Sequence, residues 1–410
     1  MAGRHRIDAI LDGRLCSGCG GCAHVGRDSG VVMLDFPSVG RRPHWEGELP
    51  LQVKDAMADC CPGGRVESPA AGRPRPTDPA ELVVGPSAAI WEGWATDPEI
   101  RRAASSGGVV TALATYCLER LGMALVVHTG MDPDQPWLNR TVVSTDRQGV
   151  LANAGSRYAP SSPLEALDVI EASDRPCVFI GKPCDVAAVA RLRRSRPQLD
   201  RNLGLVLSFF CAGTPSTAAT LSLAGSLGFD STSITSVKYR GDGWPGLFRV
   251  RDEAGREASL TYEESWGALA RRHRQLRCHL CPDGLGELAD VTGGDAWHRR
   301  GEGTDGISLI MARSSRGREI VELALRDGYL TGSPSTSQAV EQAQGLVARR
   351  RLVSARIAAL RVFGRPVPHF PGFFLAAAAR QQTASALIKE FAGMAKRIVT
   401  RGYLKPEPRD

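Results

Sequence analysis

Short apolar segments alternate with amphipathic segments through the middle of the chain. Apolar runs of strand length occur at residues 124–129, 177–180 and 203–210. Segments with helical spacing of apolar positions accompany them, at residues 109–121, 186–194 and 216–227. Strands that alternate with helices are typical of an α/β layer with some parallel pairing. We therefore predict an α/β fold with a mixed sheet flanked by helices.

The two ends of the chain differ from this centre. Residues 1–68 look rich in loops, and residues 69–80 are rich in proline, which breaks regular structure. From about residue 337 onward the pattern is mostly helical. We predict four parts: an N-terminal domain (1–68), a Pro-rich linker (69–84), a central domain (85–336) and a helical C-terminal extension (337–410).

Composition narrows the class of protein. At 410 residues the chain has room for two or three domains. No apolar run reaches the length of a membrane span, and the first residues lack the apolar core of a signal peptide. We therefore expect a cytoplasmic protein, in which cysteines stay reduced and serve as ligands more often than they form disulfides.

Net charge does not indicate a nucleic-acid-binding protein. The formal charge is +7, but the 51 basic residues are dispersed among 44 acidic ones. No basic run is long enough to read as a binding arm. An Arg-rich, solvated surface explains the charge, and a modest attraction to an acidic protein partner stays open.

Four cysteines near the N-terminus have the spacing of an iron–sulfur motif. Cys16, Cys19 and Cys22 form a C-x-x-C-x-x-C run, and Cys61 follows later with a proline directly after it. Such a run wraps three sides of a 4Fe-4S cluster, and its glycines permit tight turns. Structural zinc is the alternative, although three cysteines at this spacing crowd a tetrahedral ion. We predict a 4Fe-4S cluster in this N-terminal cysteine group, with Cys61 rather than Cys60 as fourth ligand.

A second set, the inner cysteine group, is scattered along the chain. Cys184 and Cys211 each follow a predicted strand and precede a predicted helix, and Cys278 and Cys281 form a C-x-x-C pair. Parallel strands would bring the first two to one carboxyl edge of the sheet, where α/β folds place their ligands. Each single cysteine could instead be a buried filler, and the pair could be redox-active or half of a zinc site. Residue spacing alone leaves these alternatives open.

The helix predicted from residue 109 is preceded by four small residues, Ser105, Ser106, Gly107 and Gly108. A helix N-terminus with free backbone N–H groups makes an anion site, although an ordinary capped helix is the alternative. Two predicted loops, residues 239–246 with Arg240 and Trp244, and residues 293–298, combine glycine, aromatic and ionisable residues. They are plausible linings for a planar cofactor.

Several of these segments together resemble one family, the coenzyme F420 hydrogenase/dehydrogenase beta subunits. Its relatives include 7-hydroxymethyl chlorophyll a reductase and a ferredoxin-dependent divinyl-protochlorophyllide reductase. The resemblance covers roughly residues 85–335, and its segments are 105–113, 155–158, 181–184, 211–216, 243–246, 277–283 and 294–297. The Ser-Ser-Gly-Gly, Pro-Cys and Cys-x-x-Cys-Pro-Asp elements taken together are specific.

The resemblance implies FAD, a 4Fe-4S cluster held by the inner cysteine group, and a ferredoxin-like N-terminal domain with its own cluster. By position, Ser106, Gly107 and Gly108 would approach the FAD phosphates, and Tyr158 and Lys182 would lie near the flavin. The family commonly has threonine where Lys182 stands. A cation at that position could stabilise a reduced flavin or alter specificity.

Three functional hypotheses follow. The main one is an iron–sulfur flavoprotein reductase that takes electrons from ferredoxin through two 4Fe-4S clusters to FAD and on to an organic substrate, with Asp283, Asp295 and His298 as candidate proton donors. Each of these three could instead be a structural loop residue. The alternative is a beta-type subunit that oxidises or reduces coenzyme F420 for a hydrogenase/dehydrogenase complex. A third possibility is a non-enzymatic protein in which zinc or clusters only stabilise the fold.

Overall fold

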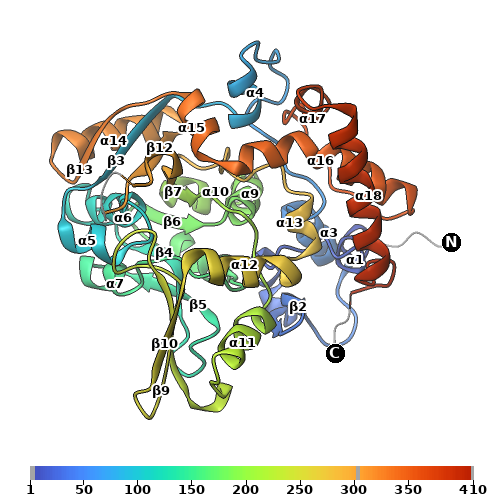
Figure 1. Cartoon of the computed structure of the whole chain (residues 1–410), viewed down its shortest axis with the longest axis horizontal. Coiled ribbons are helices and arrows are strands. Elements are labelled where there is room, and N and C mark those ends of the chain that lie inside the picture. The colour runs from blue at the N-terminus through green and yellow to red at the C-terminus, as the bar shows by residue number, and fades with distance from the viewer. Residues whose placement is uncertain (1–4, 302–304, 408–410) are drawn as a thin grey trace.

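The computed structural model describes residues 5–301 and 305–407, and an eight-stranded sheet lies at its centre (Figure 1). The strand order is β13-β3-β12-β11-β7-β6-β4-β5. In chain order these strands are β3 (Ala89–Ala95), β4 (Val126–Met131), β5 (Asn139–Ser144), β6 (Cys177–Gly181), β7 (Leu203–Phe209), β11 (Val291–Asp295), β12 (Ser308–Ala312) and β13 (Leu330–Pro334). The four central strands, β11, β7, β6 and β4, are parallel to one another, and antiparallel strands complete both edges. The predicted mixed sheet is confirmed.

Helices cover both faces of this sheet. On one face lie α6 (Val109–Glu119), α7 (Arg147–Ala152) and α14 (Ser315–Arg326), and on the other α8 (Leu167–Glu171), α9 (Pro183–Leu192) and α10 (Pro197–Asn202). Successive residues of a strand point to opposite faces. Accordingly Val178 packs in the core of the first face and Phe179 in that of the second.

The segments predicted from periodicity correspond to α6, β4, β6, α9, β7 and α11 (Thr217–Ser226). Their bounds differ by a few residues. Helix α9 begins at Pro183 rather than at residue 186, because proline fits the first helical turn and the Asp185 carboxylate accepts the Lys182 N–H at the helix start. Residues 293–295 belong to β11 rather than to a loop.

A smaller antiparallel sheet projects from the central one. Its strands are β8 (Ile234–Lys238), β9 (Leu247–Asp252) and β10 (Glu257–Thr261), and it packs against α11 and α12 (Tyr262–His273). Tyr239, Phe248 and Val250 are buried in its core. Figure 1 shows this unit at the lower edge of the molecule.

The N-terminal region contains more regular structure than its sequence indicated. It forms α1 (Arg6–Asp12), α2 (Gly21–Val25), β1 (Val32–Phe36), β2 (Gly40–His44) and α3 (Leu51–Cys60). The predicted linker also ends in a helix, α4 (Pro79–Val84), which Asp78 caps through the Ala80 N–H. Proline at a first helical position starts a helix rather than breaking one. The two remaining helices before residue 330 are α5 (Pro98–Ala103) and α13 (Leu276–His279).

The C-terminal residues form α15 (Ser337–Ala343), α16 (Gly345–Val362), α17 (Leu375–Ala379) and α18 (Ala384–Thr400). Leu11 and Met57 of the N-terminal region share one hydrophobic core with Leu360, Met394 and Ile398. The buried Arg42 and Glu407 side chains also form an ion pair between the two regions. The division into four parts stays a prediction, and this packing joins its first and last members.

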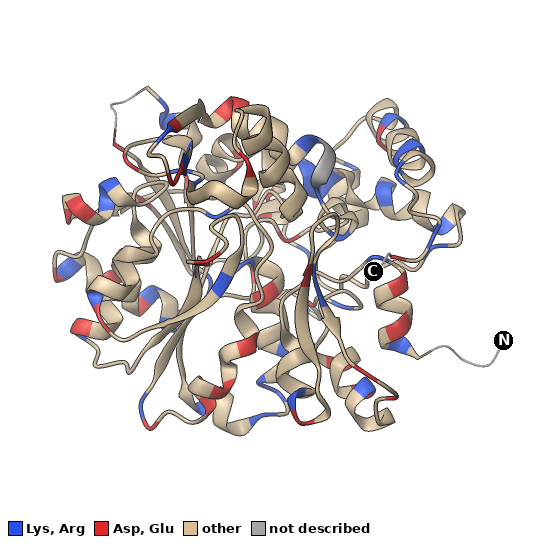
Figure 2. Cartoon of the chain, turned by 90° about the horizontal axis from the view of Figure 1, so that it is seen from below, with Lys and Arg blue, Asp and Glu red and all other residues tan. Residues whose placement is uncertain are grey.

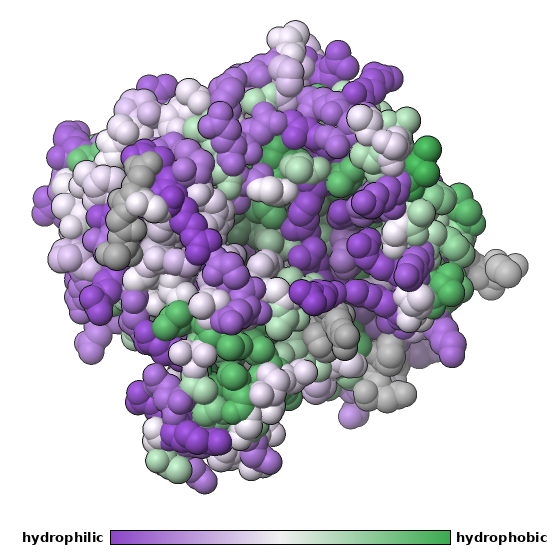
Figure 3. All heavy atoms as spheres, viewed as in Figure 1, coloured by the Kyte–Doolittle hydropathy of each residue, from purple (hydrophilic) through white to green (hydrophobic). Residues whose placement is uncertain are grey.

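Charged and apolar side chains are distributed differently over the surface. Basic and acidic residues are interspersed over the ribbon in Figure 2. In Figure 3 apolar side chains gather at the lower edge, over the smaller sheet and its helices, and at the right edge, over the C-terminal helices. Val362 of α16 and Ile388 and Val399 of α18 are exposed apolar residues of these helices. Among the described residues, no helix has both the length and the apolar character needed to cross a membrane.

Candidate functional site

The inner cysteine group meets at the carboxyl edge of the parallel strands. Cys184 follows β6 and Cys211 follows β7, while Cys278 lies on α13 and Cys281 in the turn after it. All four line one cavity, together with Pro183, Gly213, Thr214 and Gly284. The fold therefore brings these residues together at one edge of the sheet, as the sequence predicted. Their role as metal ligands stays a prediction.

Burial and local charges control the chemistry of these thiols. Burial raises the pKa of the Cys211 thiol to about 12 and raises the pKa of Cys184 well above its ordinary value. The Thr214 N–H donates to Cys278 Sγ at 3.4 Å. Lys182 is buried beside the group, where its Nζ bonds to Ser161 Oγ at 2.7 Å and pairs with Asp185 at 2.8 Å. A fixed positive charge thus lies close to Cys184 and Cys211.

The N-terminal cysteine group is enclosed more completely. Cys16, Cys19, Cys22 and Cys61 are 5–7% exposed, and Cys60 is 3% exposed. Cys16 Sγ accepts the Gly18 N–H at 3.3 Å, and Cys61 Sγ accepts the Gly63 N–H at 3.4 Å. Cys60 Sγ instead donates to the Met57 carbonyl of its own helix at 3.3 Å. This difference favours Cys61 as the fourth ligand, because a thiolate accepts hydrogen bonds and does not donate them.

Glycine allows the loop to fold tightly around these thiols. Gly18 and Gly20 have φ angles of 74° and 91°, in the left-handed region that favours glycine. A Cβ atom on Gly21 would lie 3.2 Å from Cys60 Sγ and 3.7 Å from Cys19 Sγ. A side chain at position 21 would therefore fill space beside the sulfurs.

The two cysteine groups are neighbours in the fold. Ser17, from the N-terminal motif, lines the cavity of the inner cysteine group, and so does Arg277. The Arg277 guanidinium donates from Nη2 to the carbonyl of Pro62, the residue after Cys61, at 3.0 Å. Asp185, next to Cys184, also lies close enough to Cys19 to raise the pKa of its thiol, after burial and Cys61. Residues of each group therefore contact the surroundings of the other.

The Ser-Ser-Gly-Gly turn is tied to the neighbouring strand β12. Ser106 Oγ donates to the Ile307 carbonyl, and the Gly107 N–H donates to Ser308 Oγ at 2.9 Å. A Cβ on Gly107 would lie 2.7 Å from the Gly93 carbonyl oxygen, so close packing explains this glycine. Ser105 Oγ accepts the Ser156 N–H. Gly108 starts α6 with a φ of 78°.

Arg240 and Trp244 meet at Asp295. Two guanidinium nitrogens of Arg240 donate to the Asp295 carboxylate at 2.7 and 2.9 Å, and Trp244 Nε1 donates to it at 2.7 Å. Arg240 also lies over Tyr262, 4.8 Å from its ring centroid. Charges and donors that could bind a cofactor are thus satisfied within the protein.

Aromatic rings surround this pair. Trp297 stacks on Trp244 and on Tyr262, with centroids 5.4 and 5.1 Å apart, and Tyr158 lies against Trp266 at 4.8 Å. The sequence predicted Tyr158 and Trp244 as site residues and the segment 293–298, which contains Trp297, as a cofactor lining, but it did not indicate Tyr262 or Trp266. Their signal was weak, because aromatic residues in an amphipathic helix or a loop indicate a core as readily as a site.

The three candidate proton donors lie in different surroundings. Asp283 lines the cavity of the inner cysteine group, and burial followed by Glu287 raises its pKa to about 6. Its Oδ2 has no hydrogen-bond partner among the described residues, whereas Oδ1 accepts the Glu287 N–H. Asp295 is bound to Arg240, and His298 bonds to Glu92 at 3.1 Å. Of the three, Asp283 is placed beside the thiols.

Residues that the sequence reading missed complete the inner cavity. Besides Ser17 and Arg277 they include Leu346 and Arg349 of α16. Arg349 donates to the carbonyls of Ala212 and Cys278 at 2.7 and 3.4 Å. Arg277 adjoins the Cys-x-x-Cys pair and could have been noticed. No sequence pattern indicated that α16 contributes to this cavity, because the helix is distant in sequence and reaches the cavity only through the tertiary fold.

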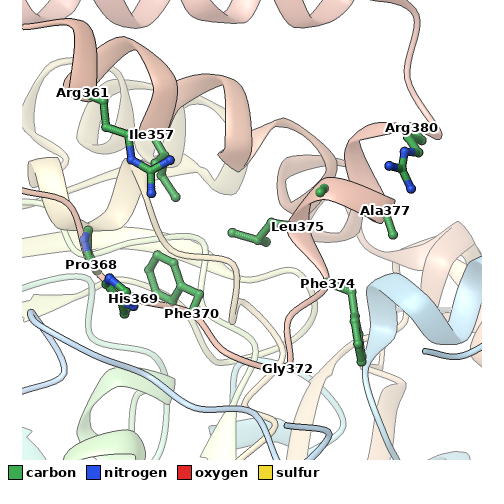
Figure 4. A pocket seen from close by; sticks show the side chains of 11 residues that line it. Ile357, Arg361, Pro368, His369, Phe370, Gly372, Phe374, Leu375, Ala377 and Arg380 are labelled. Atoms are coloured by element: carbon green, nitrogen blue, oxygen red, sulfur yellow. The ribbon is translucent and has the colours of Figure 1, made fainter. Parts of the chain in front are cut away.

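A second cavity, of about 460 Å³, lies between α16 and α17 (Figure 4). Arg361 and Ile357 project from α16 toward Phe370 and Leu375, and Arg380 lies at the far end. The cavity contains none of the predicted site residues. Within residues 5–301 and 305–407, no three His, Cys, Asp or Glu side chains are grouped as they would be around a single metal ion.

Two family models match the chain. The model for the N-terminal domain of coenzyme F420 hydrogenase/dehydrogenase beta subunits matches residues 90–168, and the model for the C-terminal domain matches residues 174–338. Together they cover more than half of the chain and include the inner cysteine group. The N-terminal cysteine group and α16 to α18 lie outside the matched residues.

Curated relatives agree with this match. The coenzyme F420 hydrogenase subunit beta of Methanosarcina barkeri is 26% identical over 64% of this chain and 86% of its own length. The F420-dependent formate dehydrogenase subunit beta of Methanocaldococcus jannaschii is 25% identical over 60% of this chain and 62% of that protein. Among solved structures, a chain of the F420-reducing [NiFe] hydrogenase complex from Methanosarcina barkeri shares the fold, with a TM-score of 0.56 and 22% identity over 72% of this chain and 98% of that one.

These relatives overturn the main functional expectation. They are named as beta subunits of F420 hydrogenases and F420-dependent formate dehydrogenases, not as ferredoxin-dependent FAD reductases of organic substrates. The main expectation, a ferredoxin-dependent FAD reductase of an organic substrate, was therefore wrong, and the alternative, a beta-type subunit, agrees better. The relatives are subunits of oxidoreductase complexes, so an oxidoreductase role fits this chain. By its matched models and shared fold, the chain belongs to the coenzyme F420 hydrogenase/dehydrogenase beta subunit family.

Proposed function

We propose that this chain is the beta-type subunit of an F420-linked oxidoreductase complex. In this role it exchanges electrons between coenzyme F420 and a partner hydrogenase or dehydrogenase subunit. The observation that carries the proposal is the adjacency of two cysteine groups in a chain of this family, one inside the family-matched region and one outside it. Two neighbouring redox centres suit a subunit that passes electrons onward.

We propose further that each cysteine group holds one 4Fe-4S cluster. The residues fit such a group, because thiolates are soft ligands for iron and several backbone N–H groups point at the sulfurs. These donors belong to Gly18, Gly63 and Thr214. When bound, the clusters would supply sites that each accept one electron.

Burial and neighbouring cations act in opposite directions on the anionic sulfur that a cluster requires. Burial raises the pKa of Cys61 and Cys211 to about 12, so these thiols hold their protons at neutral pH without iron. Ligands must be deprotonated to bind metal, and cluster insertion would therefore release protons. Lys182 lies close to Cys184 and Cys211, and Arg277 lies close to Cys281. Their positive charges would stabilise the deprotonated sulfurs.

FAD has less support from the residues. The polar groups expected to hold it are bonded within the protein: Ser105, Ser106, Gly107, Arg240 and Trp244 all have protein partners. Lys182 is likewise engaged by Ser161 and Asp185, and Tyr158 packs on Trp266. These contacts give no independent support for FAD, which remains a proposal from the family resemblance alone. Flavin quantification in the purified chain tests it.

A titration with reduced F420 tests the proposed function. The chain, purified without oxygen and loaded with iron, is mixed with reduced F420 while cluster signals are followed by electron paramagnetic resonance. We expect oxidised F420 to appear as the clusters become reduced, with one F420 consumed for every two electrons taken up. Dithionite serves as the control reductant. Reduction by dithionite but not by F420 would overturn the proposal.

A partner subunit is the second requirement of this proposal. Affinity purification of the chain from its own cells, without oxygen, should recover a hydrogenase or dehydrogenase subunit in stable stoichiometry. The complex should couple F420 turnover to that subunit's substrate. A chain that purifies alone and turns over F420 with a small organic substrate would contradict the subunit role.

A further inference from the structure

Arg277 lies between the two cysteine groups. It is on α13, directly before Cys278, and lines the cavity of the inner cysteine group. Its Nη2 reaches the other way and donates to the carbonyl of Pro62, next to Cys61. One side chain therefore touches the surroundings of both groups.

The guanidinium of Arg277 is buried without a matching anion. The residue is 2% exposed, its face lies 5.1 Å from the Phe370 ring centroid, and Nε and Nη1 have no hydrogen-bond partner among the described residues. A buried charge with unused donors is costly unless something compensates it. It lies close enough to one thiol of each cysteine group, Cys61 and Cys281, for its charge to oppose the rise in their pKa that burial causes.

Other buried arginines of this chain show what is missing. Arg42 pairs with Glu407, Arg240 with Asp295, and Arg350 with Glu287. Each of these arginines has a carboxylate partner inside the protein. No ion pair with a carboxylate is formed by Arg277 in the part of the chain that the structure describes. Its counter-charge must come from another source.

We propose that Arg277 supplies the positive charge that balances both iron–sulfur clusters. By doing so it raises the reduction potential of each cluster. The inference rests on the proposed function, since it needs a cluster in each cysteine group. A cluster bound by four thiolates is anionic and gains one more negative charge on reduction. A cation beside it therefore stabilises the reduced form. Because Arg277 adjoins both groups, its removal should affect both clusters.

Arg349 supplies a matched control. It also lines the inner cavity and carries the same charge, but it donates only to the carbonyls of Ala212 and Cys278. Arg349→Met should therefore shift the inner cluster alone. Arg277→Lys keeps the charge of Arg277 but loses its planar fork, and should retain part of the effect.

The experiment is a redox titration of the iron-loaded full chain, followed by electron paramagnetic resonance. Iron is counted first, and roughly eight atoms per chain are expected for two four-iron clusters. In Arg277→Met we expect the equilibrium constant for reduction to fall at least tenfold at each cluster. This corresponds to midpoint potentials that are more negative by about 59 mV for one electron. Arg277→Lys should lie between wild type and Arg277→Met.

The outcomes separate the inference from the proposed function. Fewer than eight irons in the wild-type chain would refute the two-cluster assignment itself. Eight irons with unchanged potentials in Arg277→Met, or a shift at one cluster only, would refute the role of Arg277 and leave the proposed function standing. If Arg277→Met fails to retain iron, the midpoint potentials are measured in Arg277→Lys and Arg277→Gln instead. Equal potentials in these two variants would overturn the inference, because only the lysine variant keeps the positive charge.

Discussion

The N-terminal and inner cysteine groups present similar thiols in different ways. Three of the four N-terminal cysteines lie within seven residues, and all four are at most 7% exposed. The four inner cysteines come from three distant segments and are only partly buried. A local motif carries its geometry with it, whereas a scattered set depends on the sheet that gathers it. We therefore expect the enclosed group to serve electron storage and transfer, and the more exposed group to lie nearer to a substrate.

Removing one ligand from each group should give the largest difference between them. Cys278→Ala and Cys19→Ala should each lose about four irons, because a four-iron cluster needs its four ligands. We expect Cys278→Ala to reduce F420 oxidation at least about 100-fold. Cys19→Ala should keep the reaction with F420 but stop delivery to an external acceptor. Equal effects on the F420 reaction, measured by its absorbance, would remove the functional distinction between the two groups.

The choice between Cys60 and Cys61 sharpens the description of the N-terminal group. Cys61→Ser should lose about half of the bound iron, since its sulfur accepts the Gly63 N–H and adjoins Cys16. Cys60→Ser should retain it, because the Cys60 thiol donates within its own helix. Iron and acid-labile sulfide per chain are the measurement. Iron loss confined to Cys60→Ser would reverse the assignment.

The inner group is further distinguished by the buried pair of Lys182 and Asp185. Lys182→Met leaves the Asp185 carboxylate buried without its cation, which should lower the free energy of unfolding by about 3–5 kcal/mol. The exposed pair of Arg193 and Asp200 is the control, and Arg193→Met should cost under about 1 kcal/mol. Urea denaturation followed by circular dichroism measures both. Similar small losses in the two variants would show that the buried pair is not held together as described.

His128 provides a smaller effect that belongs to neither cysteine group. Burial lowers its pKa to about 4, and its Nε2 bonds to Ser144 Oγ at 2.8 Å. The unfolded chain takes up a proton near pH 6.5 while the folded chain does not, so stability falls as pH drops from about 6.5 toward 4. Between pH 7.5 and 5 the loss should be about 2 kcal/mol, and His128→Gln should lack this part. An unchanged pH dependence of stability in His128→Gln would contradict the assignment of this effect to His128. Effects of acid on the clusters can be compared between wild type and this variant.

Much of the fold could be predicted from periodicity. The β6–α9 and β7–α11 units were recognisable because each begins with a short continuous apolar run and goes on with helical spacing of apolar residues. The N-terminal hairpin of β1 and β2 was not recognisable, since charged and glycine residues interrupt its short strands. The packing of α16 and α18 against α1 and α3 was also out of reach, because contacts between the two ends of a chain leave no local pattern.

The sequence by itself determined the N-terminal cysteine motif, the strand-end positions of Cys184 and Cys211, and membership of the family, because spacing and residue type are local properties. Only the tertiary structure decided that the two cysteine groups adjoin each other across Arg277, that Arg349 of α16 joins the inner cavity, and that Arg240 is bound to Asp295. These contacts join residues more than 50 positions apart, and their formation depends on how the sheet and its helices pack.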